Sequence, residues 1–317
     1  MASQTQKGKA FEYACLKALE NHLKTNQEVK INATSALETA KGFYYDSESK
    51  LVEKLDKAAS AAVRIILRLE PQLQNPDNNV PLYLSIQEDA QGIAGDVRDV
   101  LCIRKQNEWE IGISCKHNHA AVKHSRLSYT IDFGLSWFGK TCSDKYFKTI
   151  KPLFDELKVL KGKKVKWSEI ENKEDNVYVP LLNAFVEELQ RIDKEYVNEI
   201  PAALLKYLLG KNDFYKVITK DSKKLTQIQA YNLFGTLNRH SQKVKPELKV
   251  QQLKLPTKFF DISYKENSRN TIIVTCDGGW ALSFRIHNAS TYVEPSLKFD
   301  VQLIGVPQSL HTQIEPW

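Results

Sequence analysis

The sequence predicts an α/β core followed by a β-rich lobe at the C-terminus. Through most of the first two thirds of the chain, apolar residues recur at helical spacing, broken by a few short runs that alternate like strands. In the final third, β-branched and aromatic runs are separated by turn residues. This change of pattern predicts two domains, a core with helical additions at residues 1–205 and a basic lobe at residues 206–317.

Local patterns place the individual elements. In the first expected helix, Phe11, Cys15 and Leu19 form an apolar stripe, and Glu12 lies beside it. Helices are expected at residues 9–23, 47–69, from about 119, 144–160 and through most of 176–209. Strands are expected at residues 81–86, 215–219, 225–231, 271–276, 280–287 and 299–304. Asp277-Gly-Gly279 is a strong turn signal between two of these strands.

A further hairpin is expected in the middle of the core. Residues 99–104 and 108–115 are apolar, β-branched runs joined by a polar link. A two-residue turn at Gln106 and Asn107 would place Asp99 opposite Ser114, with Lys116 one step further on the same face. A carboxylate and an ammonium group would then meet at the open end of two strands. Metal-dependent nucleases need this pairing, although Asp99 as a strand cap and Lys116 as a solvated strand end is the structural alternative.

Composition limits the class of protein. The chain has 317 residues, of which 42% are hydrophobic and 26% charged, as in ordinary globular proteins. The N-terminus has no apolar signal segment, and no apolar run approaches the roughly 20 residues of a membrane span, so we expect no membrane partner. Five scattered cysteines without a C-x-x-C pair favour a reducing cytoplasm and argue against a disulfide framework.

The positive charge is concentrated in one region. The net charge is +7, and residues 204–258 hold twelve Lys and Arg against three acidic residues. Such a region favours a polyanionic partner, and a lysine-rich solvated surface is the alternative.

Histidines cluster just after Lys116. Zinc is disfavoured here, because Cys115, His117 and His119 alternate on a strand end and match no closed zinc site. Two interpretations remain for this segment, a phosphate-binding edge beside Lys116 or residues that only cap and pack. The side chains concerned are His117, His119, Lys123, His124 and Arg126.

Two stretches carry a family resemblance. The run GDVRDVLCIR…EIGISCKHNHAAVKHSRLS, followed by Trp137-Phe-Gly139, resembles the HaeIII-type family of type II restriction endonucleases, which cut GGCC. Residues 278–289 and 296–300 resemble a C-terminal block of the same family. The resemblance implies a PD-(D/E)xK-like nuclease core, in which helices flank a mixed central sheet. It also implies Mg²⁺ dependence, duplex DNA as substrate, no nucleotide cofactor, and hydrolysis of one phosphodiester per strand in a bacterial cytoplasm. A palindromic site suggests a homodimer on the DNA.

The chain departs from the family pattern at one position. Ser114 stands where the second metal-binding acid is expected, and Glu110 lies roughly 13 Å away along the strand. Glu12 is our first choice of substitute, because related nucleases often supply a glutamate from the first helix and residues 8–12 resemble that helix. Asp132, which follows Lys116, is the second choice. Asp96 is the third, since the hairpin register turns it to the other face.

Base recognition is expected in the C-terminal lobe. Arg285 is the leading candidate, because a guanidinium can donate two parallel hydrogen bonds to guanine. His287 shares its strand face, Asn288 begins the following turn, and Arg126 and Arg269 are further candidates. In the alternative interpretation, Arg285 only pairs with a carboxylate such as Asp300.

Two other functions stay open at this level. A non-cleaving, sequence-specific DNA-binding protein is one, because Ser114 could mark a degenerate site. A repair or structure-specific nuclease is the other. Incubation of a plasmid with Mg²⁺ separates the three functions, since they predict discrete GGCC fragments, no cutting, or nicking and smearing.

Overall fold

The computed structural model describes residues 3–74, 80–93, 95–119, 122–241 and 244–317. The chain folds into two compact units. The first contains Met1–Ala120, Gly210–Leu253 and Gln308–Trp317, and the second contains Ala121–Leu209 and Lys254–Pro307. Each unit therefore uses residues from both sides of position 205. The division into a nuclease core at residues 1–205 and a basic, β-rich lobe at residues 206–317 stays a prediction.

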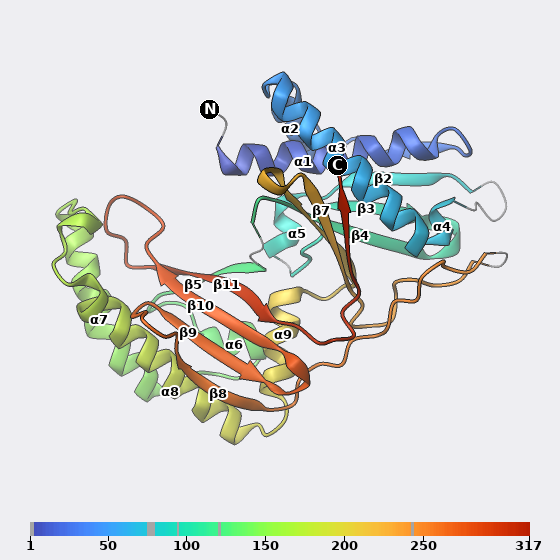
Figure 1. The fold of residues 1–317 in the computed structure, drawn as a ribbon. Helices are drawn as coiled ribbons and strands as arrows, with labels where there is room; N and C mark the ends of the chain where they lie inside the picture. The colour runs from blue at the N-terminus through green and yellow to red at the C-terminus, as the bar shows by residue number, and fades with distance from the viewer. Residues whose placement is uncertain (1–2, 75–79, 94, 120–121, 242–243) are drawn as a thin grey trace. The chain divides into compact units, whose positions relative to one another are not determined.

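The first unit is built on a mixed seven-stranded sheet (Figure 1). Its strands, in spatial order, are β1 (Val29–Ile31), β2 (Leu82–Ile86), β3 (Val100–Arg104), β4 (Trp109–His117), β6 (Phe214–Lys220), β7 (Leu225–Tyr231) and β12 (Thr312–Pro316). The pairs β1–β2 and β4–β6 are parallel, and the other neighbours are antiparallel. A mixed sheet with helices confirms the predicted α/β class.

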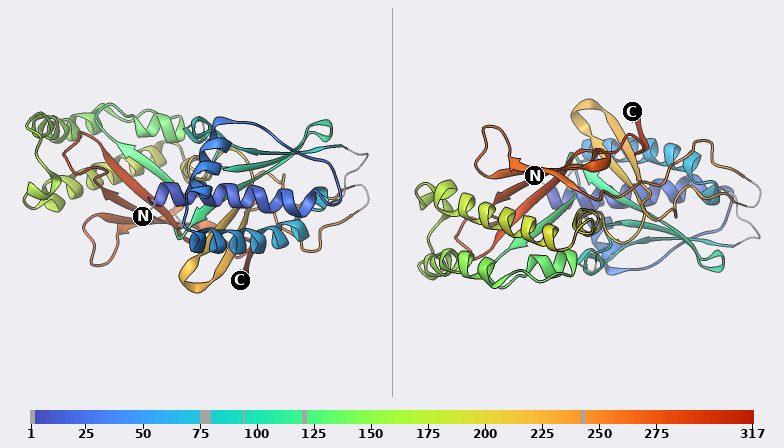
Figure 2. Two further views of the ribbon diagram at one scale, coloured as in Figure 1. Left: turned by 90° about the horizontal axis from the view of Figure 1, so that it is seen from above. Right: turned by 90° about the horizontal axis from the view of Figure 1, so that it is seen from below.

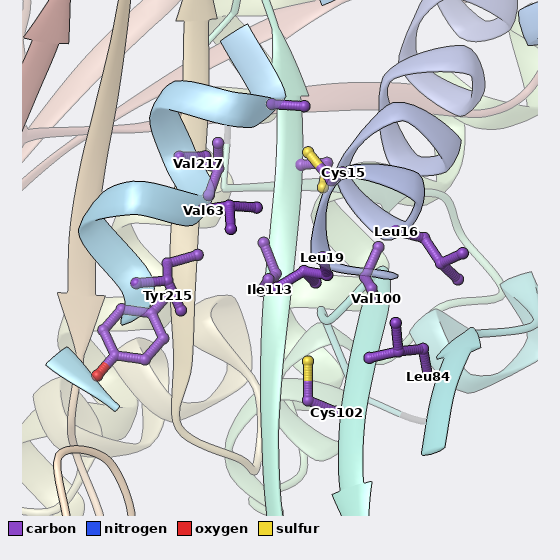
Figure 3. Close-up of a cluster of buried hydrophobic side chains, with 14 of the residues drawn as sticks. Cys15, Leu16, Leu19, Val63, Leu84, Val100, Cys102, Ile113, Tyr215 and Val217 are labelled. Atoms are coloured by element: carbon purple, nitrogen blue, oxygen red, sulfur yellow. The ribbon is translucent and has the colours of Figure 1, made fainter. Parts of the chain in front are cut away.

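Helices α1 and α3 cover one face of this sheet (Figures 1 and 2). The helices of the unit are α1 (Gln4–Leu23), α2 (Ser35–Tyr45), α3 (Ser49–Leu69), α4 (Pro71–Gln74) and α5 (Asp89–Ile93). Helix α1 begins earlier than predicted because Ser3 and Gln6 form a reciprocal capping box. Figure 3 shows the core between helices and sheet, where Cys15 and Leu19 of α1 lie with Ile113 of β4 and Val217 of β6.

The β3–β4 hairpin has the predicted register. Val100 pairs with Ile113 and Cys102 with Ile111, and the backbone N–H of Asp99 donates to the carbonyl of Ile113 at 2.8 Å. The connection is longer than the expected two residues. A 3₁₀ turn at Lys105–Asn107 is followed by Glu108, whose φ of 48° is left-handed.

The second unit is built on an antiparallel five-stranded sheet. Its strands, in spatial order, are β5 (Lys123–Leu127), β11 (Leu297–Gly305), β10 (Ala281–His287), β9 (Thr271–Cys276) and β8 (Phe259–Tyr264). Its helices are α6 (Phe133–Phe138), α7 (Asp144–Gly162), α8 (Val179–Glu195) and α9 (Ile200–Leu209). Aromatic side chains fill the core, with the Phe185 ring 5.9 Å from Phe284 and 5.1 Å from Phe299 between ring centres.

Short 3₁₀ and π turns complete the described chain. They are Trp167–Glu169, Glu174–Tyr178, Asp221–Lys223 and Asp277–Gly279. The last lies between β9 and β10, where Gly278 and Gly279 have φ values of 67° and 85°. Glycine takes this left-handed backbone without the steric cost of a Cβ, which accounts for the turn signal in the sequence.

The helix predicted from about residue 119 is wrong. The chain forms strand β5 at Lys123–Leu127 and starts a short helix only at Phe133. Strand β5 pairs with β11, with Arg126 beside Lys298 and Leu127 beside Leu297. Hydrogen bonds from a strand so distant in the sequence override the local pattern.

Within the described residues, every helix is too short or too polar to cross a membrane. All five cysteines are buried and none forms a disulfide, which agrees with the absence of a disulfide framework.

Gly112 provides a test of the hairpin packing. A Cβ at this position would overlap the buried side chain of Arg98 close to its backbone, so Gly112→Ala should lower the free energy of unfolding by about 1–3 kcal/mol. As a control, Gly42→Ala lies in α2 with open space around it and should raise stability by about 0.5–1 kcal/mol. Chemical denaturation measures both. A Gly112→Ala variant as stable as wild type would contradict this account of the hairpin.

Candidate active site

Asp99 is held at the open end of the β3–β4 hairpin by three contacts. Its Oδ2 accepts a hydrogen bond from the backbone N–H of Cys115 at 2.6 Å. The same oxygen lies 3.3 Å from the hydroxyl of Ser114 and 3.3 Å from Nζ of Lys116. The structure therefore brings Asp99 and Lys116 together as the sequence predicted. The second oxygen, Oδ1, takes no part in these three contacts.

Lys116 is a charged group in this arrangement. Burial alone would lower the pKa of its ammonium group, but the negative charges of Asp99 and Glu12 outweigh burial and raise it. About a fifth of the side chain is exposed, as is a fifth of Asp99. The pair can thus be reached from solvent while it stays partly desolvated.

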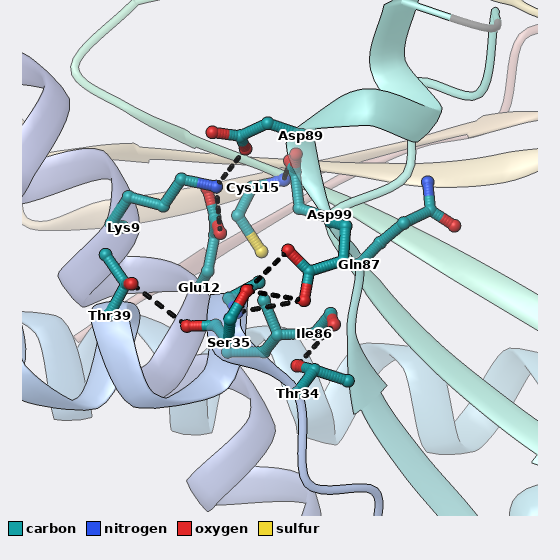
Figure 4. A network of polar contacts seen from close by, with 12 residues as sticks. Lys9, Glu12, Thr34, Ser35, Thr39, Ile86, Gln87, Asp89, Asp99 and Cys115 are labelled. Carbon is teal, nitrogen blue, oxygen red and sulfur yellow. Dashed lines mark hydrogen bonds and ion pairs between the residues drawn. The ribbon is translucent and has the colours of Figure 1, made fainter.

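Glu12 reaches the same place from helix α1 (Figure 4). It is 6% exposed, and burial together with the charge of Asp99 raises its pKa to about 8. Lys9, one turn earlier, donates to Oε2 of Glu12 at 3.2 Å and to Oδ1 of Asp89 at 2.6 Å. Neither Lys9 nor Asp89 was predicted from the sequence. Lys9 could have been found from its i, i+3 spacing to Glu12, but Asp89 lies in the distant helix α5.

The donor set suits a hard divalent cation. Asp99 and Glu12 offer carboxylate oxygens, and the charge of Asp99 makes the ionisation of Glu12 less favourable, a penalty that a bound cation would relieve. In the parts of the chain that the structure describes, no cluster of three His, Cys, Asp or Glu side chains forms a metal site. Cations such as Mg²⁺ are usually held by only one or two carboxylates, with water and substrate phosphate as the other ligands. The two carboxylates therefore fit such an ion.

The other acidic candidates have structural partners. Asp132 is the N-cap of α6, where its carboxylate accepts from the backbone N–H groups of Leu135 and Cys142. Asp96 forms a buried ion pair with Arg98, 2.6 Å from Oδ2 to Nη2. Arg98 also pairs with Glu110 at 2.5 Å. Of the three proposed substitutes, Glu12, Asp132 and Asp96, it is Glu12 that interacts with Asp99.

The residues after Lys116 mostly serve the fold. His117 is buried and lies 3.1 Å from Oδ2 of Asp221, and His119 follows the end of β4 as an exposed residue. Lys123 donates to the carbonyl of Tyr207 at 3.1 Å, and burial lowers the pKa of its amine. The His124 side chain lies outside what the structure describes. Arg126 is exposed and contacts the hydroxyl of Ser296 at 3.1 Å.

The proposed base-reading residues lie on β10 and just after it. Arg285 is half exposed and pairs with Asp300 of β11 at 3.3 Å. His287 lies on the same strand face, and its Nδ1 is 2.9 Å from the carbonyl of Asn288. The amide of Asn288 serves the fold, since its oxygen accepts from Tyr178 and its nitrogen donates to Ser290.

Arg269, the reserve candidate for base reading, forms an ion pair with Asp175.

Part of the basic surplus lies at one hairpin tip. Lys220, Lys223 and Lys224 flank the turn between β6 and β7, and the last two are exposed. Lys245 is also exposed. Lys243 lies outside the described residues.

An α/β fold with an acid pair and a charged lysine at the end of a hairpin defines a candidate metal-dependent phosphodiester hydrolase. The sequence matches the HaeIII restriction endonuclease family over residues 8–307, and the chain belongs to that family. It is 44% identical over 310 residues to the type II restriction enzyme HaeIII of Haemophilus aegyptius, covering 98% of this chain and 97% of the relative. No solved structure matches it. The protein is therefore a type II restriction endonuclease homologue, a site-specific deoxyribonuclease.

The raised pKa of Glu12 gives a test of the site's electrostatics. The folded chain holds this proton more tightly than the unfolded chain, so the free energy of unfolding of the metal-free protein should fall as the pH rises from about 4.5 to about 8. Glu12→Gln removes this titration and should reduce the fall. Part of the fall should remain, because burial also raises the pKa of Glu70 to about 7.

Denaturant titrations across this pH range measure the effect. Glu20→Gln, on the same helix but away from Asp99, is the control and should leave the wild-type pH profile in place. If the free energy of unfolding of Glu12→Gln depended on pH as that of wild type does, the result would contradict the placement of a carboxyl group with a raised pKa beside Asp99.

Proposed function

We propose that Asp99, Glu12 and Lys116 form a PD-(D/E)xK-type active site, which cuts both strands of duplex DNA within GGCC. The observation that carries the proposal is the convergence of Lys116 on the Asp99 carboxylate, with Glu12 close enough for the Asp99 charge to raise its pKa. The GGCC sequence comes from the family resemblance. Membership in a restriction endonuclease family supports DNA as the substrate.

The replaced acid is the main departure from the PD-(D/E)xK pattern. Ser114 is buried and contacts Asp99, so it occupies the place of the usual second carboxylate without its charge. Glu12 supplies that charge from helix α1. Asp132 is the weaker choice, because both of its oxygens accept backbone hydrogen bonds at the start of α6.

Asp99 and Glu12 would hold Mg²⁺, which when bound supplies Lewis-acid stabilisation of the phosphate and lowers the pKa of a coordinated water. Lys116 acts in its charged form, because Asp99 and Glu12 raise its pKa. As an ammonium group it can donate hydrogen bonds to the attacking water and offset the negative charge that develops on the phosphate. The water oxygen forms a bond to phosphorus while the bond to the 3′ oxygen breaks, leaving a 5′-phosphate and a 3′-hydroxyl.

Other features of the proposal follow from the reaction. Hydrolysis by water needs no nucleotide cofactor. A four-base palindrome presents two equivalent scissile bonds, so we propose that two copies of the chain act on one site. The non-cleaving alternative rests on Ser114, and Glu12 offers a replacement for the missing acid. No feature of the described residues favours the repair-nuclease alternative.

Lys116→Ala tests the proposed chemistry. The variant should cut a plasmid roughly 100- to 1,000-fold more slowly, which is what removal of one charge-stabilising group costs, while it keeps its affinity for a GGCC duplex. Lys41→Ala, an exposed lysine on α2, is the control and should cut like wild type. Wild type with Mg²⁺ should give discrete GGCC fragments.

Cutting by Lys116→Ala within tenfold of the wild-type rate would remove Lys116 from the mechanism. Fragments at another sequence would leave the site intact but refute GGCC as the target.

The basic hairpin tip predicts how binding depends on salt. Replacing Lys220, Lys223 and Lys224 by Gln should weaken binding to all duplexes alike. It should also reduce the slope of log K against log salt concentration by about 0.9 for each phosphate that is no longer neutralised. Fluorescence anisotropy at several salt concentrations measures the slope. An unchanged slope would show that this tip does not touch DNA.

A further inference from the structure

The five-stranded sheet of the second unit has one polar face. Along β10, Leu282, Phe284 and Ile286 are buried, while Ser283, Arg285 and His287 point to the other side, as the alternation in the sequence predicted. The buried side is filled by aromatic rings. The polar side is not needed for that core and can serve recognition.

Directly paired residues on this face place opposite charges side by side. Arg285 of β10 pairs in register with Asp300 of β11 and with Thr271 of β9. Nη2 of Arg285 lies 3.3 Å from Oδ2 of Asp300. The Arg285 side chain is 54% exposed and that of Asp300 11%, so the guanidinium extends outward from a more deeply set carboxylate.

The pair lies in a polar hollow of about 250 Å³. Its other lining residues are Lys265, Thr271, Ser283 and Gln302. Gln302 pairs in register with Ser283, and its Nε2 lies 3.4 Å from Oδ2 of Asp300. The lining carries two cationic side chains, Lys265 and Arg285, and one carboxylate, Asp300. This net positive charge suits an anionic partner, and the mixture of donors and acceptors suits one with a specific hydrogen-bonding pattern.

Structural stabilisation alone does not account for this arrangement. Asp300 is mostly buried, but Arg285 is 54% exposed and 3.3 Å away, so solvent screens the attraction between them. The cohesion of the sheet comes from the apolar face and from the strand hydrogen bonds. The pair sets the N–H donors of the half-exposed Arg285 next to Oδ2 of Asp300, a mostly buried carboxylate that lines the hollow.

This order of donors and acceptors complements a G·C pair. In the major groove guanine offers two acceptors, N7 and O6, and cytosine beside it offers the N4 amino group as a donor. An A·T pair would instead set an acceptor of thymine against the carboxylate. We propose that Arg285 and Asp300 together read one G·C pair of the target, Arg285 the guanine and Asp300 the cytosine amine. The inference rests on the proposed function, because it needs a G·C-containing recognition site.

The test uses the full chain carrying Lys116→Ala, so that binding is measured without cutting. Dissociation constants are measured for a GGCC duplex and for duplexes in which single cytosines are replaced by 2-pyrimidinone, which lacks the N4 amine. A second series replaces single guanines by 7-deazaguanine, which lacks N7. A scrambled duplex gives the non-specific affinity.

Asp300→Ala should bind the natural duplex roughly 10- to 100-fold more weakly, as expected when one base-specific interaction is removed. At one cytosine position, removal of the amine should not weaken binding by Asp300→Ala any further. The same removal should weaken binding by the parent protein, which keeps Asp300, by a factor similar to that of the mutation. Arg285→Ala should be insensitive to 7-deazaguanine in the same base pair. Asp300→Asn keeps the size of the side chain and an acceptor oxygen. Its affinity for the natural duplex should therefore lie between those of the parent protein and Asp300→Ala. Asp261→Ala, an exposed aspartate of β8, is the control and should respond to every analogue like the parent.

Two results would overturn the inference while leaving the proposed function in place. In the first, Asp300→Ala and Arg285→Ala keep the full response to every analogue. In the second, both variants melt at lower temperature and lose affinity for GGCC and scrambled duplexes by the same factor, which would assign the pair to the fold. A parent protein that binds GGCC no better than the scrambled duplex would instead refute the proposed function, and the inference with it.

Discussion

The hydrogen bond from the Cys115 backbone to Asp99 fixes the geometry on which the candidate site depends. It ties the carboxylate to the strand that carries Lys116, which keeps Asp99 within reach of the Lys116 side chain. A shift of one residue in the register would turn Lys116 to the opposite face. The buried side chains of β3 and β4 therefore do more than stabilise the unit, because they select the single register that brings acid and lysine together.

Charge balance is the second constraint. Two carboxylates, Asp99 and Glu12, lie close together in a partly desolvated place, and burial raises the pKa of Glu12. Two ammonium groups, Lys9 and Lys116, offset part of this cost. The remaining repulsion between the carboxylates is unfavourable for the protein alone and favourable for binding a cation. Strongly shifted pKa values of this kind are concentrated at functional sites.

The parts of the site that could be predicted from the sequence are those fixed by local patterns. The position of the turn between the two apolar runs predicted the register that places Asp99 beside Ser114, although the turn itself is longer than expected. The side of β10 that bears Arg285 followed from the alternation along that strand. The choice of Glu12 relied on family resemblance, because nothing local indicates which sheet edge a helix will meet. The link from Lys9 to Asp89 and the strand β5 depend on partners far along the chain, which a local pattern cannot reveal. The capping role of Asp132 was likewise visible only once α6 had been placed.

The central claim is that Asp99 and Glu12 share a metal ion next to Lys116. It is tested most directly by a crystal structure with Mn²⁺, in place of Mg²⁺, and uncleaved GGCC duplex, using the anomalous signal of the metal. We predict a peak about 2.0–2.3 Å from carboxylate oxygens of both Asp99 and Glu12. A peak that contacts Asp132 and not Glu12, or that lies away from Asp99, would contradict the account.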